Sequence, residues 1–301
     1  MAPFVPTQQR VAQREIVRTI KARIDTWKCD TTIIAGRYGC GKTVALEESL
    51  RDRQGIFVHT VWDKSWKTSL FERLGLNGEQ EFKEVLRLSF PCATCFAGFR
   101  GMTTVADTVA IFGKYTSSDS SLAHVIVCPS SAAVALTFQE RHRNIWVDDL
   151  TKDEAEELLK LHGQEDKKDE FLRACGYNAL DLVSACQRYA VDGEQALKAK
   201  EAMMEKMAWQ EVVCFKDQCK LRGDTGKDIL KKLVDNWQAG VLEGADCLCT
   251  SAAQRDVALW IRENDCEPVI WHTVRREYQF ASELHARVAT EILSSNSQST
   301  P

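Results

Sequence analysis

The sequence predicts an α/β fold, in which a doubly wound parallel sheet is followed by a helical segment and then by a small winged-helix-like module. Between residues 31 and 147, short apolar runs alternate with helical patterns, which is typical of a parallel sheet whose strands are joined by helices. After residue 150 the alternation stops, and helical patterns follow one another to residue 221. From residue 227 the order is helix, helix, two short β-type runs and helix, which is compatible with a winged helix.

The bulk composition indicates a globular protein with no membrane span. The chain has 301 residues, of which 44% are apolar, enough for two domains or for one domain with appendages. The formal net charge of −4 gives no basic footprint for nucleic acid over the whole chain. No apolar run reaches the length of about 18 residues that a membrane helix needs, and the N-terminal residues lack a secretory pattern. The twelve cysteines are scattered singly, which fits a reducing compartment, so we expect an intracellular protein, cytoplasmic or nuclear.

Helix and strand patterns can be assigned along most of the chain. Residues 7–27 carry apolar side chains at near-helical spacing, so an amphipathic helix is expected there, after the extended lead-in 3–6. Strands are expected at residues 32–35, 56–59, 93–99, 122–128 and 144–147, and two later β-type runs at 268–273 and 277–280. Helices are expected at residues 44–50, 62–74, 79–88, 105–115, 132–138, 151–161, 168–175, 180–192, 195–221, 227–239, 252–264 and 282–293.

A glycine-rich segment joins the first expected strand to the helix after it. Gly36, four further residues and then Gly41-Lys42-Thr43 have the full spacing of a phosphate-binding loop, in the strand-loop-helix context that this loop requires. Glycines let main-chain N–H groups point inward around a phosphate, and the helix start adds its positive end. We expect Lys42 to lie between the β- and γ-phosphates and the Thr43 hydroxyl to ligate Mg²⁺. The residues expected to bind a nucleoside triphosphate are Gly36, Arg37, Tyr38, Gly39, Cys40, Gly41, Lys42, Thr43 and Val44.

The acidic partner of such a loop is missing from the third expected strand. Residues 93–99 contain no carboxylate, although this strand should end in Asp or Asp-Glu to hold the Mg²⁺ shell and polarise water. Asp148-Asp149 offers paired acids after the fifth strand, but it leads directly into a helix whose start, Thr151 to Glu154, has the capping-box pattern. A strand end and a helix cap are therefore favoured over a magnesium site. Nucleotide binding is thus predicted, while hydrolysis is left open.

In their order along the chain, the motifs resemble those of the AAA+/STAND group of P-loop ATPases, close to its archaeal-type branch. The matching parts are the lead-in FVP, the loop GRYGCGKT, the stretch LTKDEAEELL after the last strand, GYNALDL and the winged-helix-like C-terminal order. The resemblance covers most of the chain and implies ATP and Mg²⁺ as ligands, with residues 151–222 as a helical lid. It also implies that Ser130 or Ser131 plays the sensor role and that residues 4–6 help to enclose the adenine.

The sequence also departs from the pattern of this group. Asn178-Ala179 stands where the group has a proline turn, and the lid-sensor position has no arginine, Arg173 lying one turn earlier. Arg143 follows the expected sensor helix, where such proteins present an arginine to a neighbour's γ-phosphate, but a solvated basic turn is favoured. Arg275-Arg276 at the tip of the C-terminal hairpin could contact a nucleic-acid backbone. Because the surrounding sequence is not basic, a packing module is favoured there.

The expected organisation is a nucleotide-binding domain at 1–150, a lid at 151–222, a winged-helix-like module at 223–293 and a disordered tail at 294–301. The first hypothesis is a nucleotide-dependent switch or weak ATPase, which converts ATP and water to ADP and phosphate. Mg·ATP would close the lid and change how the C-terminal module is presented, to a protein partner or in self-association. The second hypothesis is an ATP-binding scaffold that does not hydrolyse. The lid and C-terminal order argue against a third, a small-molecule kinase.

Overall fold

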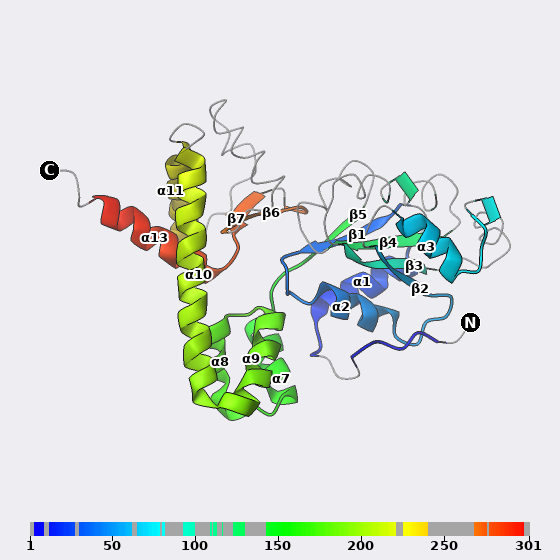
Figure 1. Cartoon of the computed structure of the whole chain (residues 1–301), viewed down its shortest axis with the longest axis horizontal. Helices are drawn as coiled ribbons and strands as arrows, with labels where there is room; N and C mark the ends of the chain where they lie inside the picture. The colour runs from blue at the N-terminus through cyan, green and yellow to red at the C-terminus, as the bar shows by residue number, and fades with distance from the viewer. Residues whose placement is uncertain are drawn as a thin grey trace. The chain divides into compact units, whose positions relative to one another are not determined.

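The chain forms two compact units, Met1–Leu161 and His162–Pro301. The computed structural model describes residues 3–8, 12–27, 30–61, 65–78, 80–81, 93–99, 109, 111–112, 116, 123–129, 143–220, 225–239, 268–275 and 277–297 (Figure 1). The helices expected at 79–88, 105–115, 132–138 and 252–264 lie wholly or largely outside these residues.

Five parallel strands form the sheet of the first unit. They are β1 (Thr32–Gly36), β2 (Phe57–Val61), β3 (Ala93–Phe99), β4 (His124–Pro129) and β5 (Arg143–Val147), in the spatial order β2-β3-β4-β1-β5. Every neighbouring pair is parallel, which confirms the parallel sheet predicted from the sequence. The inner strand β1 lies between β4 and β5, and its last residue, Gly36, pairs with Val147. Because β1, β4 and β5 run in parallel, the segment after β1 lies beside the carboxyl ends of β4 and β5.

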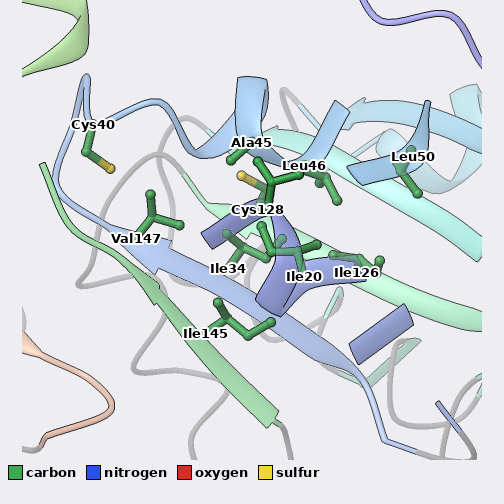
Figure 2. Packing of buried hydrophobic residues seen from close by; sticks show 11 residues of the cluster. Ile20, Ile34, Cys40, Ala45, Leu46, Leu50, Ile126, Cys128, Ile145 and Val147 are labelled. Atoms are coloured by element: carbon green, nitrogen blue, oxygen red, sulfur yellow. The ribbon is translucent and has the colours of Figure 1, made fainter. Parts of the chain in front are cut away.

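The core of this unit lies where two helices, α1 (Glu15–Asp25) and α2 (Lys42–Leu50), pack against each other and the sheet. A third helix, α3 (Trp66–Arg73), buries Trp66 and Leu70. Burying an aliphatic side chain contributes roughly 1.5–3 kcal/mol relative to leaving it exposed. The buried side chains Ala45, Leu46 and Leu50 therefore stabilise the position of α2 in this core. Figure 2 shows the cluster, which consists of Val17, Ile20, Ile34, Cys40, Ala45, Leu46, Leu50, Ile126, Cys128, Ile145 and Val147.

The first helix is shorter than the sequence predicts. It begins at Glu15, whereas the apolar spacing predicts a helix from residue 7. Arg14 has extended backbone angles (φ −125°, ψ 138°), and the backbone N–H of Gln13 donates to the Glu157 carboxylate at 3.0 Å. Tertiary contacts therefore use the main chain just before Glu15, and the helix starts only after them.

The last helix of the first unit, α7 (Lys152–Leu161), starts with the predicted capping box. The Glu154 N–H donates to the Thr151 hydroxyl at 3.3 Å, and the Thr151 N–H donates to the Glu154 carboxylate at 3.1 Å. These reciprocal bonds satisfy two main-chain donors that have no partner within the helix. The boundary between the units falls after Leu161, so α7 belongs to the first unit, whereas the sequence places this boundary at residue 150.

Replacing Thr151 with alanine is expected to lower the free energy of unfolding by about 1 kcal/mol, because the Glu154 N–H loses its cap. Urea unfolding followed by circular dichroism measures this loss. Lys152→Ala is the matched control, since the Lys152 side chain is 66% exposed and takes no part in the box. Equal stability of Thr151→Ala and the unsubstituted protein would show that the cap contributes nothing.

The second unit is mainly helical and contains a short hairpin. Its elements are the 3-10 turn Glu165–Lys167, α8 (Lys168–Cys175), α9 (Ala179–Asp192), α10 (Glu194–Lys220), α11 (Thr225–Ala239), β6 (Val269–His272), β7 (Glu277–Phe280) and α13 (Glu283–Ser297). The long helix α10 packs against α8, α9, α11 and α13, and β6 pairs with β7 in antiparallel fashion. One continuous helix therefore joins the helices expected in the lid to those expected in the C-terminal module.

The C-terminal helix extends further than predicted. It continues to Ser297, whereas the sequence predicts a helix that ends at residue 293 and a disordered tail at 294–301. The hydroxyls of Ser294 and Ser295 donate to the main-chain carbonyls of Thr290 and Glu291 at 2.8 and 3.0 Å. These serine hydroxyls bond within the last turns of the helix.

Within the part of the chain that the structure describes, no helix is long and apolar enough to cross a membrane.

Candidate nucleotide-binding site

The segment after β1 turns sharply, and its glycines adopt conformations that disfavour other residues. Gly36, Gly39 and Gly41 have φ values of +152°, +79° and +92°. A Cβ atom on Gly36 would lie 2.3 Å from the Val147 carbonyl oxygen and 3.1 Å from the Cys40 sulfur. The main chain thus passes directly against the end of β5, where a side chain has no room. This tight, glycine-lined turn fits the wrapping of a loop around a phosphate group.

Lys42, the first residue of α2, directs its ammonium group back into the loop. The side chain is 7% exposed, and Nζ donates to the carbonyl oxygens of Gly36 and Arg37 at 2.9 and 2.8 Å. The loop therefore encloses a positive charge at the N-terminal end of a helix, where the helix dipole adds to the attraction for an anion. The donors and charges present fit the phosphates of a nucleotide.

Thr43 lies at the point where α2 and β4 meet. Thr43 is exposed, and its side chain forms a hydrogen bond with the thiol of Cys128, near the end of β4. A threonine hydroxyl at the start of α2 fits the predicted Mg²⁺ ligand. Ser130 and Ser131 follow β4 directly in the chain and lie outside the described residues.

The two cysteines of the site remain neutral thiols. Burial raises the pKa of the Cys40 thiol, and it raises the pKa of the Cys128 thiol to about 11. A thiol with a raised pKa is a poor nucleophile and a poor metal ligand at neutral pH. Cys40 therefore serves packing, with its sulfur filling the space beside Gly36.

The two acids after β5 both have partners in this structure. The Asp149 carboxylate forms an ion pair with Arg37 of the loop at 3.1 Å, with side chains 24% and 13% exposed. The Asp148 carboxylate accepts a hydrogen bond from the indole nitrogen of Trp146 at 2.8 Å. Asp148 is therefore directed back towards its own strand, and Asp149 fastens the loop to the end of β5. No local motif indicates the Arg37–Asp149 pair, which follows from the pairing of β1 with β5.

Arg14, just before α1, connects the loop to two other segments. Its Nη1 donates to the Cys40 carbonyl at 2.7 Å, and its Nη2 donates to the Asp148 carbonyl at 2.9 Å. Its Nε donates to the Glu154 carboxylate at 3.2 Å, in the first turn of α7. Sequence reasoning missed Arg14 because no local pattern marks a residue whose partners lie 26, 134 and 140 residues away.

Two other predicted site residues lie away from the loop. Arg143 begins β5 beside Thr32 at the start of β1. It therefore lies at the N-terminal ends of the strands, whereas the loop lies at their C-terminal ends. Its side chain is 72% exposed, with Nε 3.8 Å from the Asp30 carboxylate. Phe4 exchanges main-chain hydrogen bonds with Arg53 and Asp52, beyond the C-terminal end of α2. The structure thus does not bring Arg143 or Phe4 to the phosphate loop of their own chain.

The first unit also contains an open cavity of about 750 Å³ between α1 and α2. Arg14 lines this cavity and contacts the phosphate loop, so the two features share one residue. The lining residues are Ala12, Gln13, Arg14, Glu15, Val17, Arg18, Lys21, Glu48, Arg51 and Leu161. Among the residues that the structure describes, no group of three or more histidine, cysteine, aspartate or glutamate side chains is placed to hold a metal ion.

The structure, but not the sequence, is similar to known proteins. No family model and no curated protein match the sequence. The structure is similar to a Walker-type ATPase of Pyrococcus abyssi, with a TM-score of 0.55 and 13% identity over 96% of this chain and 99% of that chain. Cdc6p of Pyrobaculum aerophilum (TM-score 0.47, 12% identity, 97% of each chain) and the Holliday junction branch migration motor RuvB of Thermotoga maritima (0.41, 10%, 97% of this chain and 96% of that one) are less similar. Over nearly its whole length the chain therefore has the fold of this Walker-type ATPase, with a glycine-rich loop after the inner strand β1.

Proposed function

We propose that the first unit binds ATP with Mg²⁺ and that the protein is a nucleotide-dependent switch or a weak ATPase. The observation that supports this most directly is the Lys42 ammonium, held 2.9 and 2.8 Å from two loop carbonyls at the start of α2. Three glycines with positive φ surround it, and the Thr43 hydroxyl lies one residue further on. Together these groups would hold the phosphates and one position of the Mg²⁺ shell.

A non-hydrolysing scaffold is the second candidate function, and one observation favours it. Strand β3 (Ala93–Phe99) lies between β2 and β4, yet its sequence contains no carboxylate. In P-loop NTPases an acid at this place binds Mg²⁺ and assists the attacking water. Asp148 and Asp149 do not replace it in the present structure, since Trp146 and Arg37 engage them. The geometry therefore supports binding more strongly than turnover.

In this proposal the nucleoside occupies the cavity between α1 and α2. Arg14 contacts the loop carbonyl of Cys40 and lines the cavity, which brings the cavity next to the phosphates. Ala12, Val17 and Leu161 give it apolar lining for a base. In this proposal the cavity, rather than residues 4–6, encloses the adenine, because Phe4 bonds to Arg53 and Asp52 and is not among the residues that line the cavity.

We further propose that α8, α9 and the first half of α10 act as the lid, and that α11, α13 and the β6–β7 hairpin form a winged-helix-like module. The order of these elements and the antiparallel hairpin support this assignment. Because α10 is continuous through both parts, a movement of the lid would be passed to the C-terminal module, where a protein partner or a second copy would bind. Arg143 remains a candidate to reach the nucleotide of such a copy, because it is exposed.

Titration of the protein with ATP in the presence of Mg²⁺, combined with steady-state phosphate release, tests the proposal. Binding together with phosphate release that Lys42→Ala abolishes would support the ATPase. Tight binding with no release above that of Lys42→Ala would support the scaffold instead. Absence of ATP binding by the unsubstituted protein would refute both.

Replacing Asp148 with asparagine is expected to leave Mg²⁺-dependent ATP affinity unchanged. The carboxylate accepts the Trp146 indole N–H, and an amide oxygen can still accept it, so the local structure is kept. ATP titrations with and without Mg²⁺ measure the effect. Thr43→Ala is the positive control, because loss of the metal-ligating hydroxyl should remove most of the Mg²⁺ dependence. A large loss of Mg²⁺-dependent affinity in Asp148→Asn would instead make Asp148 the magnesium carboxylate.

A further inference from the structure

Arg14 uses every nitrogen of its guanidinium group on a different segment of the first unit. Nη1 binds the Cys40 carbonyl, Nη2 binds the Asp148 carbonyl and Nε binds the Glu154 carboxylate. The Arg14 and Glu154 side chains are only 10% and 13% exposed. Charge-assisted hydrogen bonds that are shielded from water are stronger than those of an exposed ion pair. The contacts of Arg14 are thus of the kind that fixes geometry.

The contact with Cys40 bears directly on the phosphate loop. In a trans peptide the carbonyl and the following N–H point in opposite directions. Because Arg14 draws the Cys40 carbonyl to itself at 2.7 Å, the N–H of Gly41 points away from Arg14. Gly41 has a φ of +92°, and a glycine can adopt many backbone conformations. A hydrogen bond from another residue is therefore needed to select one orientation of the Cys40–Gly41 peptide.

The contact with Glu154 connects the same residue to α7. Glu154 accepts from Arg14 and from the Thr151 N–H through one carboxylate oxygen, so the helix cap and the arginine share an acceptor. The N–H of the preceding residue, Gln13, donates to Glu157 one turn further along α7. Residues 13 and 14 are therefore fixed to the first two turns of α7, the last helix before the chain enters the second unit.

We propose that Arg14 is the positioning residue of the phosphate loop: it orients the Cys40–Gly41 peptide so that the Gly41 N–H faces the phosphates, and it couples this orientation to α7. The proposal deepens the nucleotide-binding function proposed above and rests on it. Binding of a triphosphate fixes the Cys40–Gly41 peptide, the fixed carbonyl holds Arg14, and Arg14 holds the cap of α7. A lysine at this place keeps the charge but lacks the planar fork that reaches three acceptors.

The test compares Arg14→Lys with a matched arginine at the other end of α2. Arg53 also binds one carboxylate, that of Asp25 at 2.6 Å, and one main-chain carbonyl, that of Ser49 at 3.2 Å. Arg14→Lys is expected to weaken Mg·ATP binding about tenfold, while Arg53→Lys leaves it unchanged. Inorganic tripolyphosphate should lose affinity to the same extent, because the effect lies in the phosphate loop.

Hydrogen exchange distinguishes the proposed coupling from a general loss of stability, because it measures the protection of the loop and of α7 separately. In the unsubstituted protein, Mg·ATP should slow exchange in residues 37–42 and also in residues 152–157 of α7. In Arg14→Lys the loop should still be protected at saturating nucleotide, whereas the protection of α7 should be lost. Equal protection of α7 in both proteins, or unchanged affinity in Arg14→Lys, would overturn the proposal.

Exchange without nucleotide separates the two proposals. There Arg14→Lys should speed exchange in residues 37–42 and 152–157 together, and Arg53→Lys in neither. That result would uphold the role of Arg14 in the loop even if ATP did not bind, an outcome that would refute only the nucleotide-binding function. Should Arg14→Lys fail to fold, Glu154→Gln removes the partner charge and keeps an acceptor for the Thr151 N–H. It should give the same pattern, with an affinity loss of about threefold.

Discussion

Alanine in place of Lys42 is expected to weaken Mg·ATP binding by about 100-fold or more and to abolish any phosphate release. The ammonium is buried inside the loop, and on binding it would donate charge-assisted hydrogen bonds to two phosphates. Each such bond contributes roughly 1.5–3 kcal/mol, and about 1.4 kcal/mol corresponds to a factor of ten in affinity. Isothermal titration with Mg·ATP and a steady-state phosphate assay measure the two effects.

The control for this substitution is Lys152→Ala, which removes an equal charge from a side chain of the same unit that is 66% exposed. Its affinity for Mg·ATP should equal that of the unsubstituted protein. Hydrogen exchange in α2 checks that Lys42→Ala leaves the helix folded. If folded Lys42→Ala bound ATP as tightly as the control, the phosphates would have to lie elsewhere, and the assignment of the loop would be wrong.

Alanine at position 36 is expected to lower the free energy of unfolding by more than about 3 kcal/mol and to remove ATP binding. The new Cβ would lie 2.3 Å from the Val147 carbonyl oxygen, a distance that no Cβ atom tolerates, so β1 and β5 would have to separate at their carboxyl ends. The φ of +152° adds backbone strain of roughly 1–3 kcal/mol. Urea unfolding and ATP titration measure these losses.

Gly75→Ala is a well-matched control for the steric part of this effect. Gly75 also has a positive φ, +69°, but a Cβ there would meet no atom within 4 Å. It should therefore show only the backbone strain, about 1 kcal/mol, and unchanged ATP affinity. Similar losses in both variants would mean that the contact between Gly36 and Val147 is not close in solution.

The part of the site that local sequence could predict is the phosphate loop itself. A loop between a strand and a helix is read from neighbouring residues, and the spacing from Gly36 to Thr43 rarely arises by chance in that context. A third strand is expected at 93–99 because a doubly wound fold requires one there, although this segment lacks an acid, and β3 confirms it, because it pairs with strands on both sides.

The supporting contacts of the site could not be predicted, because they join residues far apart in sequence. Asp149 contacts Arg37 across 112 residues, and Arg14 contacts Asp148 across 134. Such pairs depend on which strands lie next to each other in the folded sheet, and the residues near each partner do not encode this strand order. The same cause accounts for the start of α1, where the bond from Gln13 to Glu157 overrides the apolar spacing.

The strand order also has a consequence for folding during synthesis on the ribosome. Thr32 at the start of β1 pairs with Ile126 on one side and with Arg143 on the other, and both partners come much later in the chain. During synthesis, the loop sequence therefore leaves the ribosome long before the strands that flank it. A nascent chain that ends before residue 143 lacks the wall against which Gly36 turns, so it would have no nucleotide affinity. If the unit binds ATP as proposed, the nucleotide would stabilise only the finished unit, by binding it after its last strand has been added.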